Sequence, residues 1–301
     1  MKRLIFVVLF TLPLHAGIVL YGGNGGEGAG ISVNDGWLVT INQNTGAVTP
    51  VGHPDNTARI SGLAFDLNGS LYVTTLGGGG FPPPPGPTTT SNLLLLNSLT
   101  GAVLSTIGQV HDSTGTGIAI ADLALQPGTG TLFGVRAPAD QGGGAGLLYT
   151  INKANGLATL VGNTGHMFGS IAFAPNGTLY MSSADLAMGP SNPHLLTLNP
   201  GNASTLTSVA TVDFFGALAV RPGDNVIFGG TGDGATIDTI NPVSGAETLV
   251  GSTGQNFVGD FDFQVPEPGT LGLLGLGILC LGVIAYNRKL CPRTKTMPPN
   301  M

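Results

Sequence analysis

The stretch "WLVTINQNTGAVTPVG", residues 37–52, predicts the fold, because variants of it recur along the chain. It combines an apolar run, an asparagine, a short turn and a second apolar run. The same order begins again at Leu93, Leu147, His194 and Thr236. The anchoring asparagines are Asn42, Asn97, Asn152, Asn199 and Asn241, separated by 55, 55, 47 and 42 residues. Self-similarity at this period predicts a repeat architecture.

A second pair of apolar runs lies between these copies. Examples are "SGLAFDLNGSLYVTT", residues 61–75, and "GSIAFAPNGTLYMSS", residues 169–183. Each repeat is therefore expected to hold four short strands, which we call a, b, c and d in chain order. Gly, Asn and Pro supply the backbone angles of the turns between them. Four strands per unit of about 40–55 residues are typical of propeller blades, and the body resembles a β-propeller repeat protein.

The two ends of the repeat region complement each other. A b-type run at residues 18–22 opens it, and an a-type run at residues 259–263 ends it. Together with residues 37–52 these runs would complete one blade from both termini and remove an exposed sheet edge. The sequence thus predicts an all-β, five-bladed propeller over residues 17–264. An elongated β-solenoid or a sandwich remains the alternative.

The a-type runs share an alternating pattern. Large apolar residues alternate with a small one, which suits a sheet packed on both faces and lets blades converge near an axis. The fifth run departs from this, because Asp262 takes the place of the alanine. The alanines are Ala64, Ala124, Ala172 and Ala219.

Composition narrows the class of protein. Of the 301 residues, 50 are glycine and only 9% are charged, against about 7% and about 25% in ordinary globular chains. Hydrophobic residues reach 42%, which disfavours disorder. The net charge of −6 argues against nucleic acid as a partner. Both cysteines, Cys280 and Cys291, lie near the C-terminus, so no disulfide is expected in the body.

Both termini carry targeting features. Residues 1–16 have the pattern of a secretory signal peptide, with Lys2 and Arg3 before an apolar run and a small residue at Ala16. Residues 270–286 are uncharged, a length at the short limit for a membrane helix. Basic residues follow, so residues 290–301 are expected to form a cytoplasmic tail, with the body on the other side.

The C-terminal segment, residues 265–289, has three parts in a fixed order. "VPEP" precedes an apolar Gly/Leu-rich span, and "RK" follows it. This order resembles the PEP-CTERM sorting signal of Gram-negative bacteria. The resemblance implies processing by an exosortase, export to the cell envelope or surface, and an association with extracellular polysaccharide and biofilm. The residues that carry it are Pro266, Glu267, Pro268, Arg288 and Lys289.

The turns differ in length between the two ends of the expected blades. The a–b and c–d turns are uniformly tight, whereas the b–c and d–a connections are long and variable. Binding residues usually lie on loops held by a rigid scaffold, so the second set is the expected binding face. The alternative is a set of tolerated insertions. The longest connections are residues 22–36, 77–90, 137–146 and 184–193.

A few polar residues could gather near the mouth of the central channel. Carboxylates and imidazoles there could hold a cation. The histidines lie at different offsets from the next a-type run, so a ligand geometry is not implied, and solvated polar residues in a water-filled channel are the other interpretation. We expect no metal and no cofactor. The candidates are His53, His111, Asp122, His166, Asp260 and Asp262.

No motif in the sequence indicates catalysis. Residues 23–28 match G-x-G-x-x-G, but no helical pattern follows, so the phosphate-binding context is missing. The expected function is therefore a non-catalytic binding or structural module at the cell surface, with polysaccharide or a partner protein as ligand. The alternative is a secreted propeller hydrolase, lactonase-like or glycan-cleaving, that uses the Asp and His candidates. A structural filler of the biofilm matrix is the third possibility.

Overall fold

The architecture comes from a computed structural model, and all statements on structure concern the residues that it describes. These are residues 17–24, 36–54, 58–77, 90–136, 146–166, 169–184, 192–231, 235–254 and 258–265. The expected signal peptide, sorting segment and tail lie outside them. Among the described residues, no helix is long and apolar enough to cross a membrane.

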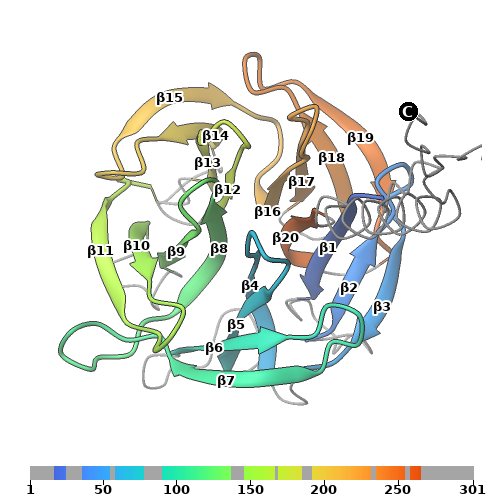
Figure 1. Cartoon of the computed structure of the whole chain (residues 1–301). Helices are drawn as coiled ribbons and strands as arrows, with labels where there is room; N and C mark the ends of the chain where they lie inside the picture. Colours follow the sequence, from blue (N-terminus) through green and yellow to red (C-terminus); the bar gives the residue numbers. More distant parts are fainter. Residues whose placement is uncertain are drawn as a thin grey trace, which may run out of the picture. The chain divides into compact units, whose positions relative to one another are not determined.

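Twenty strands form five antiparallel sheets of four strands each (Figure 1). Blade 1 comprises β4 (Ala58–Phe65), β5 (Leu71–Gly77), β6 (Ser91–Leu96) and β7 (Val103–Gln109). Blade 2 comprises β8 (Ile120–Gln126), β9 (Thr131–Arg136), β10 (Leu147–Ile151) and β11 (Ala158–Asn163). Blade 3 comprises β12 (Gly169–Phe173), β13 (Leu179–Ala184), β14 (Pro193–Leu198) and β15 (Thr205–Ala210). Blade 4 comprises β16 (Phe215–Val220), β17 (Ile227–Thr231), β18 (Thr236–Ile240) and β19 (Glu247–Ser252).

The closing blade is built from both ends of the repeat region. Its strand order is β20 (Val258–Gln264), β1 (Val19–Asn24), β2 (Leu38–Ile41) and β3 (Val48–Gly52). Strands β1 and β20 pair antiparallel, with Leu20 opposite Phe263. The prediction of a five-bladed propeller closed by its two ends is confirmed. The closure places the N-terminal strand between two strands that follow it by very different distances in sequence.

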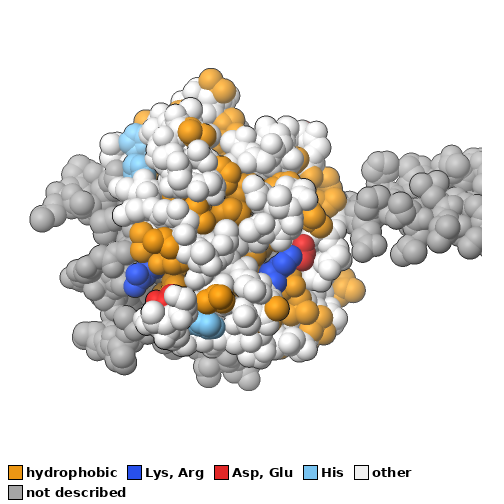
Figure 2. Space-filling model, turned by 60° about the vertical axis from the view of Figure 1, so that its left-hand side comes forward, with side chains coloured by type: hydrophobic (Ala, Val, Ile, Leu, Met, Phe, Trp, Pro, Cys, Tyr) orange, Lys and Arg blue, Asp and Glu red, His pale blue; other side chains and the backbone are white. Residues whose placement is uncertain are grey.

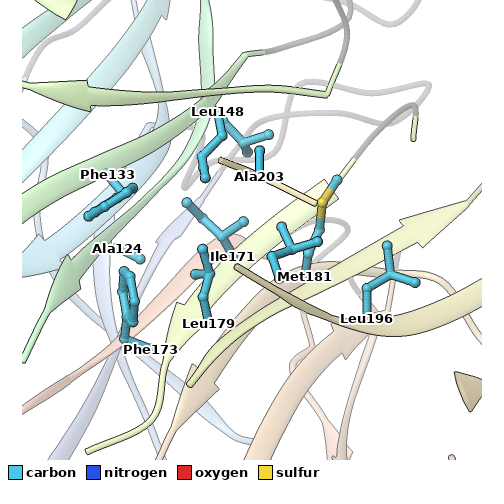
Figure 3. Close-up of a cluster of buried hydrophobic side chains, with 11 residues drawn as sticks. Ala124, Phe133, Leu148, Ile171, Phe173, Leu179, Met181, Leu196 and Ala203 are labelled. Carbon is cyan, nitrogen blue, oxygen red and sulfur yellow. The ribbon is translucent and has the colours of Figure 1, made fainter. Parts of the chain in front are cut away.

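The inner strands β4, β8, β12, β16 and β20 surround the axis, each packed against the next (Figure 1). The hydrophobic core consists of five clusters between neighbouring blades. In the cluster of Figure 3, Phe133 of blade 2 meets Phe173 of blade 3 edge to face, with ring centroids 5.3 Å apart. Ala124 lies in the same cluster and is buried. Its small side chain lets the inner strands converge, as the alternating pattern predicted.

The repeated asparagine organises each c–d turn. Its side-chain Oδ1 accepts a hydrogen bond from the backbone N–H two residues later, at 2.8–2.9 Å in all five blades. Four residues after it the chain adopts a positive φ, which glycine takes without strain. The positive-φ residues are Gly46, Gly101, Gly156, Ala203 and Gly245. The signature of the repeat is therefore the chemistry of a turn.

At the tight-turn end of the ring, polar pairs join neighbouring blades. In each pair, the residue at or just beyond the end of an inner strand contacts the residue that follows the repeated asparagine of the next blade, over 2.5–3.3 Å. The three pairs differ in chemistry: one is an ion pair, one joins an arginine to a glutamine, and one joins a glutamine to a serine. The pairs are Asp66–Lys153, Arg221–Gln43 and Gln264–Ser98.

The Asp66–Lys153 pair offers a measurable junction energy. The two side chains are only 12% and 28% exposed, and Lys153 also lies over the Tyr72 ring. A double-mutant cycle with alanine should give a coupling of about 1 kcal/mol in chemical unfolding, at the upper end for such pairs. The control is the hydrogen bond between Thr197 and Thr207, whose hydroxyl oxygens lie 2.6 Å apart within blade 3. An Asp66–Lys153 coupling no larger than the control would contradict a role in joining blades.

Candidate functional site

Three aspartates from two inner strands meet near the ring axis. Asp122 belongs to β8, and Asp260 and Asp262 belong to β20. The residues Asp122 and Asp260 are fully buried. Strand β4 lies between β20 and β8 in the ring, yet β20 also contacts β8 directly. The carboxyl groups of Asp122 and Asp260 lie within hydrogen-bonding reach of each other.

Gly62 of the intervening strand β4 packs closely against β8 beside Asp122. It occupies the position that Asp122 holds in β8 and Asp260 holds in β20, two residues before the alanine position. A Cβ atom at Gly62 would lie 2.9 Å from Cγ and 3.0 Å from the backbone nitrogen of Leu123. The missing side chain leaves room for β8 to approach. The sequence pattern predicted no role for Gly62, although Gly62 stands at the same position of its a-type run as Asp122 and Asp260 do in theirs.

The carboxylates accept hydrogen bonds from the backbone of the inner strands. Asp122 Oδ1 accepts from its neighbour Leu123 N–H at 2.6 Å, and Oδ2 accepts from Ile171 N–H of blade 3 at 2.7 Å. Asp262 repeats this arrangement at the junction of the closing blade with blade 1, where Oδ2 accepts from Phe65 N–H at 2.7 Å. Inner strands have one unpaired edge, and buried edge N–H groups need acceptors. The aspartates supply them and connect neighbouring blades.

Asp260 differs from the other two aspartates. Its Oδ1 accepts from Phe261 N–H at 2.6 Å, but its buried Oδ2 has no donor among the described residues. Two ionised carboxylates have no hydrogen to share. The contact between Asp122 and Asp260 therefore requires a proton on one of them.

Burial changes the acidity of all three groups. It is the largest cause that raises the pKa of Asp122 and of Asp260 well above the usual range, and the charge of Asp122 raises the pKa of Asp260 further. Burial likewise raises the pKa of Asp262 to about 7, against the opposing effect of its hydrogen bonds from Phe65 and Phe263. A carboxyl group with few charged partners loses its proton less readily in a low-dielectric site.

The histidine candidates have other neighbours. The ring of His53 packs edge-on against Trp37, with centroids 5.8 Å apart. His111 N–H donates to the carbonyl oxygen of Gly156 in blade 2 at 3.1 Å. Nε2 of His166 lies 3.4 Å from Oγ1 of Thr205. All three residues follow outer strands, where the d–a connection begins, whereas the aspartates lie on inner strands.

The structure thus brings together Asp122, Asp260 and Asp262, and places the histidines in separate blade connections. Within the described part of the chain, no group of three or more His, Cys, Asp and Glu side chains has an arrangement that could hold a metal ion. The sorting residues lie outside the described part of the chain. Most residues of the long b–c connections lie outside it too. The sorting residues are Pro266, Glu267, Pro268, Arg288 and Lys289.

A polar hollow of about 580 Å³ lies where blade 4 meets the closing blade. Its lining includes Arg221, Gln43 and Ile18. Gln43 Nε2 donates to the Ile18 carbonyl oxygen at 2.7 Å, and Arg221 Nη1 donates to Gln43 Oε1 at 3.1 Å. These hydrogen bonds connect the residue just before β1 to blade 4 through Gln43. The polar groups of the hollow are therefore explained by ring closure.

Comparisons with known proteins identify the C-terminal segment. Residues 264–289 match the model of the PEP-CTERM protein-sorting motif. No curated protein matches the chain. Among solved structures, a chain of a nidogen/laminin complex is similar at a TM-score of 0.50 and 14% identity, over 78% of this chain and 79% of that one. A protein of unknown function from Bacteroides caccae is similar at a TM-score of 0.45 and 13% identity, over 83% and 99%.

The motif establishes how the protein is sorted. It marks an exported protein of the cell envelope and implies processing by an exosortase and anchoring in the membrane. The similarity to the nidogen/laminin chain supports the propeller fold alone, because the identity is low. The resemblance stated from "VPEP" and the basic end of the span is confirmed.

Proposed function

We propose that this exported propeller is a non-catalytic binding or structural module, displayed on the surface of a Gram-negative cell or in its extracellular matrix. Matrix polysaccharide or a partner protein is its ligand. The main observation in support is that the aspartates near the ring axis accept hydrogen bonds from the backbone of the inner strands. Asp122 is fully buried and both of its oxygens accept backbone hydrogen bonds. A general acid or nucleophile must reach its substrate.

The competing function is a propeller hydrolase that uses the channel aspartates and the histidines. It would need an Asp and a His within hydrogen-bond reach of one reacting atom. A screen of lactones and polysaccharides with the purified protein separates the two functions. We expect turnover no higher than in buffer. Turnover abolished by Asp122→Asn in protein that still folds would establish the hydrolase instead.

The b–c and d–a connections form the proposed binding face. The connection between β7 and β8 is described in full, and Figure 1 shows it projecting from the ring. Asp112 organises it, because Oδ1 accepts from Thr114 N–H at 2.8 Å, Thr114 Oγ1 at 2.6 Å and Thr116 N–H at 2.9 Å. The bond from the Thr114 hydroxyl is the main cause of the lowered pKa of Asp112. A loop already held in one conformation loses less entropy on binding.

The scarcity of charged side chains on the surface favours a ligand that is bound mainly by uncharged groups. On the face in Figure 2, acidic and basic side chains are few and lie in small isolated groups among polar and apolar surface. The whole chain is only 9% charged. Hydrogen bonds and apolar contacts, rather than long-range charge, would then supply affinity and specificity.

Loosening the β7–β8 connection should weaken attachment. We expect Asp112→Ala to reduce binding to isolated matrix polysaccharide or to whole cells at least threefold in a sedimentation assay, because the loop loses three hydrogen bonds. The matched control is Asp224→Ala. Asp224 lies in the tight a–b turn of blade 4, at the end of the ring opposite to the b–c and d–a connections. Equal attachment of both variants and the wild type would reject this face as the binding face.

A further inference from the structure

We infer that Asp260 keeps a proton and donates a hydrogen bond through it to ionised Asp122 across the ring axis, so that closing the propeller is coupled to proton uptake. The bond joins β20, the last strand of the ring, to β8 of blade 2. Neither strand is the other's neighbour in the ring. The inference concerns the assembly of the fold and is independent of the ligand proposed above.

The hydrogen-bond donors around the pair decide which carboxyl holds the proton. Both oxygens of Asp122 accept backbone N–H groups, which favours its ionised form. Asp260 accepts only one, through Oδ1, and its Oδ2 is buried without a donor. A proton on Asp260 gives the pair the one donor that it lacks. The reverse assignment would place a neutral acid between two backbone N–H groups and a bare carboxylate oxygen in a buried site.

The surroundings of the pair hold little else that is charged. On the inner strands, β8 contributes Asp122, and β20 contributes Asp260 and Asp262. At the position equivalent to Asp122, β12 has Ser170 and β16 has Ala217. Strand β4 has Gly62 there, and its charged residue, Arg59, has a side chain outside the described part. The negative charge of Asp262 raises the pKa of both members of the pair.

A proton fits this pair better than a metal ion does. Calcium takes about 6–8 oxygen ligands, and magnesium needs an octahedral set. Of the six carboxylate oxygens, five already accept backbone N–H groups, and Asp260 Oδ2 is the exception. Backbone N–H groups direct positive charge at the same oxygens, which disfavours a cation there.

The coupling has a definite sign. The folded state holds a proton that the unfolded chain releases above its ordinary aspartate pKa of about 3.9. Stability from this proton is complete below that pH and is lost as the pH rises through the raised pKa of Asp260. Alkaline conditions would then place two negative charges across the axis and loosen the closing blade first.

The test compares two isosteric variants of the full-length protein in chemical unfolding from pH 4.5 to pH 8. Asp260→Asn keeps a donor toward Asp122 but takes up no proton. We expect the unfolding equilibrium constant of Asp260→Asn to rise less steeply with pH than that of the wild type. The two slopes should differ by up to about a factor of ten per pH unit, the effect of one proton. Asp122→Asn should be less stable than the wild type at every pH, because its amide NH₂ must face a backbone N–H.

Three results would overturn the inference. One is an Asp260→Asn profile as steep as that of the wild type. Another is flattening in Asp122→Asn instead, which would reverse the assignment. The third is stabilisation of the wild type, but not of Asp260→Asn, by millimolar Ca²⁺ or Na⁺, which would establish a cation between the carboxylates. If a variant at the pair does not fold, infrared spectroscopy of Asp262→Ala at pH 7 decides, because this variant lacks the other carboxyl group that is partly protonated at that pH. We expect the C=O band of a protonated carboxylic acid, lost on unfolding, and its absence in native protein would refute the shared proton.

Discussion

Replacement of Gly251 by alanine is expected to lower the free energy of unfolding by about 3 kcal/mol, the upper part of the range for overpacking. A Cβ atom at this position would overlap the carbonyl oxygen of Thr45 and lie 2.6 Å from its carbonyl carbon. Both are backbone atoms of the c–d turn in the closing blade, so neither can move without opening that junction. Thermal unfolding should show a decrease in Tm of about 6–12 °C for a domain of this size.

The matched control for Gly251 is Gly201→Ala. Neither glycine has a positive φ, so alanine adds no backbone strain at either site. The nearest atom to a Cβ at Gly201 is the side-chain Oδ1 of Asn199, at 3.3 Å, and we expect a change of less than about 0.5 kcal/mol. If Gly251→Ala were as stable as this control, the backbone contact at the closing junction would not hold the ring together.

The Asp262→Ala variant should remove one part of the pH dependence of stability. Burial raises the pKa of Asp262 to about 7, so the folded protein keeps a proton that the unfolded chain has lost. Stability from this group is complete below about pH 4 and is lost as the pH rises through about 7. The loss is at most about 4 kcal/mol, and nearer 2 kcal/mol because Asp262 retains some exposure to solvent. Urea unfolding from pH 4.5 to pH 8.5 measures it.

In Asp262→Ala, the profile should be flatter, and the variant should be less stable than the wild type at pH 4.5, because Phe65 N–H loses its acceptor. The control is Asp224→Ala. The hydrogen bond from Arg221 lowers the pKa of Asp224, so this change should leave the slope between pH 5 and pH 8 unaltered. An Asp262→Ala profile parallel to that of the wild type would show that Asp262 is already ionised in the native ring.

Much of this fold follows from local sequence. The repeated asparagine and the positive-φ residue four positions later specify the c–d turn within five residues, and the structure contains that turn in every blade. Strand positions follow from the alternation of large and small apolar residues. The pairing of β1 with β20 was predictable because a lone b-type run and a lone a-type run complement each other. The sorting segment was also readable, since its signal is contiguous.

The arrangement of the candidate site was less accessible. Asp122 and Asp260 stand at equivalent positions of their a-type runs. No local pattern shows that the two carboxyl groups approach each other across the axis, past β4. The contact depends on how closely the inner strands approach one another, as at Gly62, where a Cβ atom would lie 2.9 Å from Cγ of Leu123 in β8. The same holds for the histidines, whose separation from the aspartates depends on how far each d–a connection travels from the outer rim. The junction pairs, such as Asp66 with Lys153, likewise join turns of different blades.

The sequence by itself determined the strands, the turns, the number of blades, the closure by both termini and the sorting route. These properties rest on interactions between residues close together in the chain, or on repetition. The tertiary structure alone decided that three aspartates lie near one axis, two of them fully buried, and that Asp260 Oδ2 has no donor among the described residues. The physical reason is that burial and shared protons depend on the distance between groups from different blades. Ring closure sets that distance, and sequence spacing does not record it.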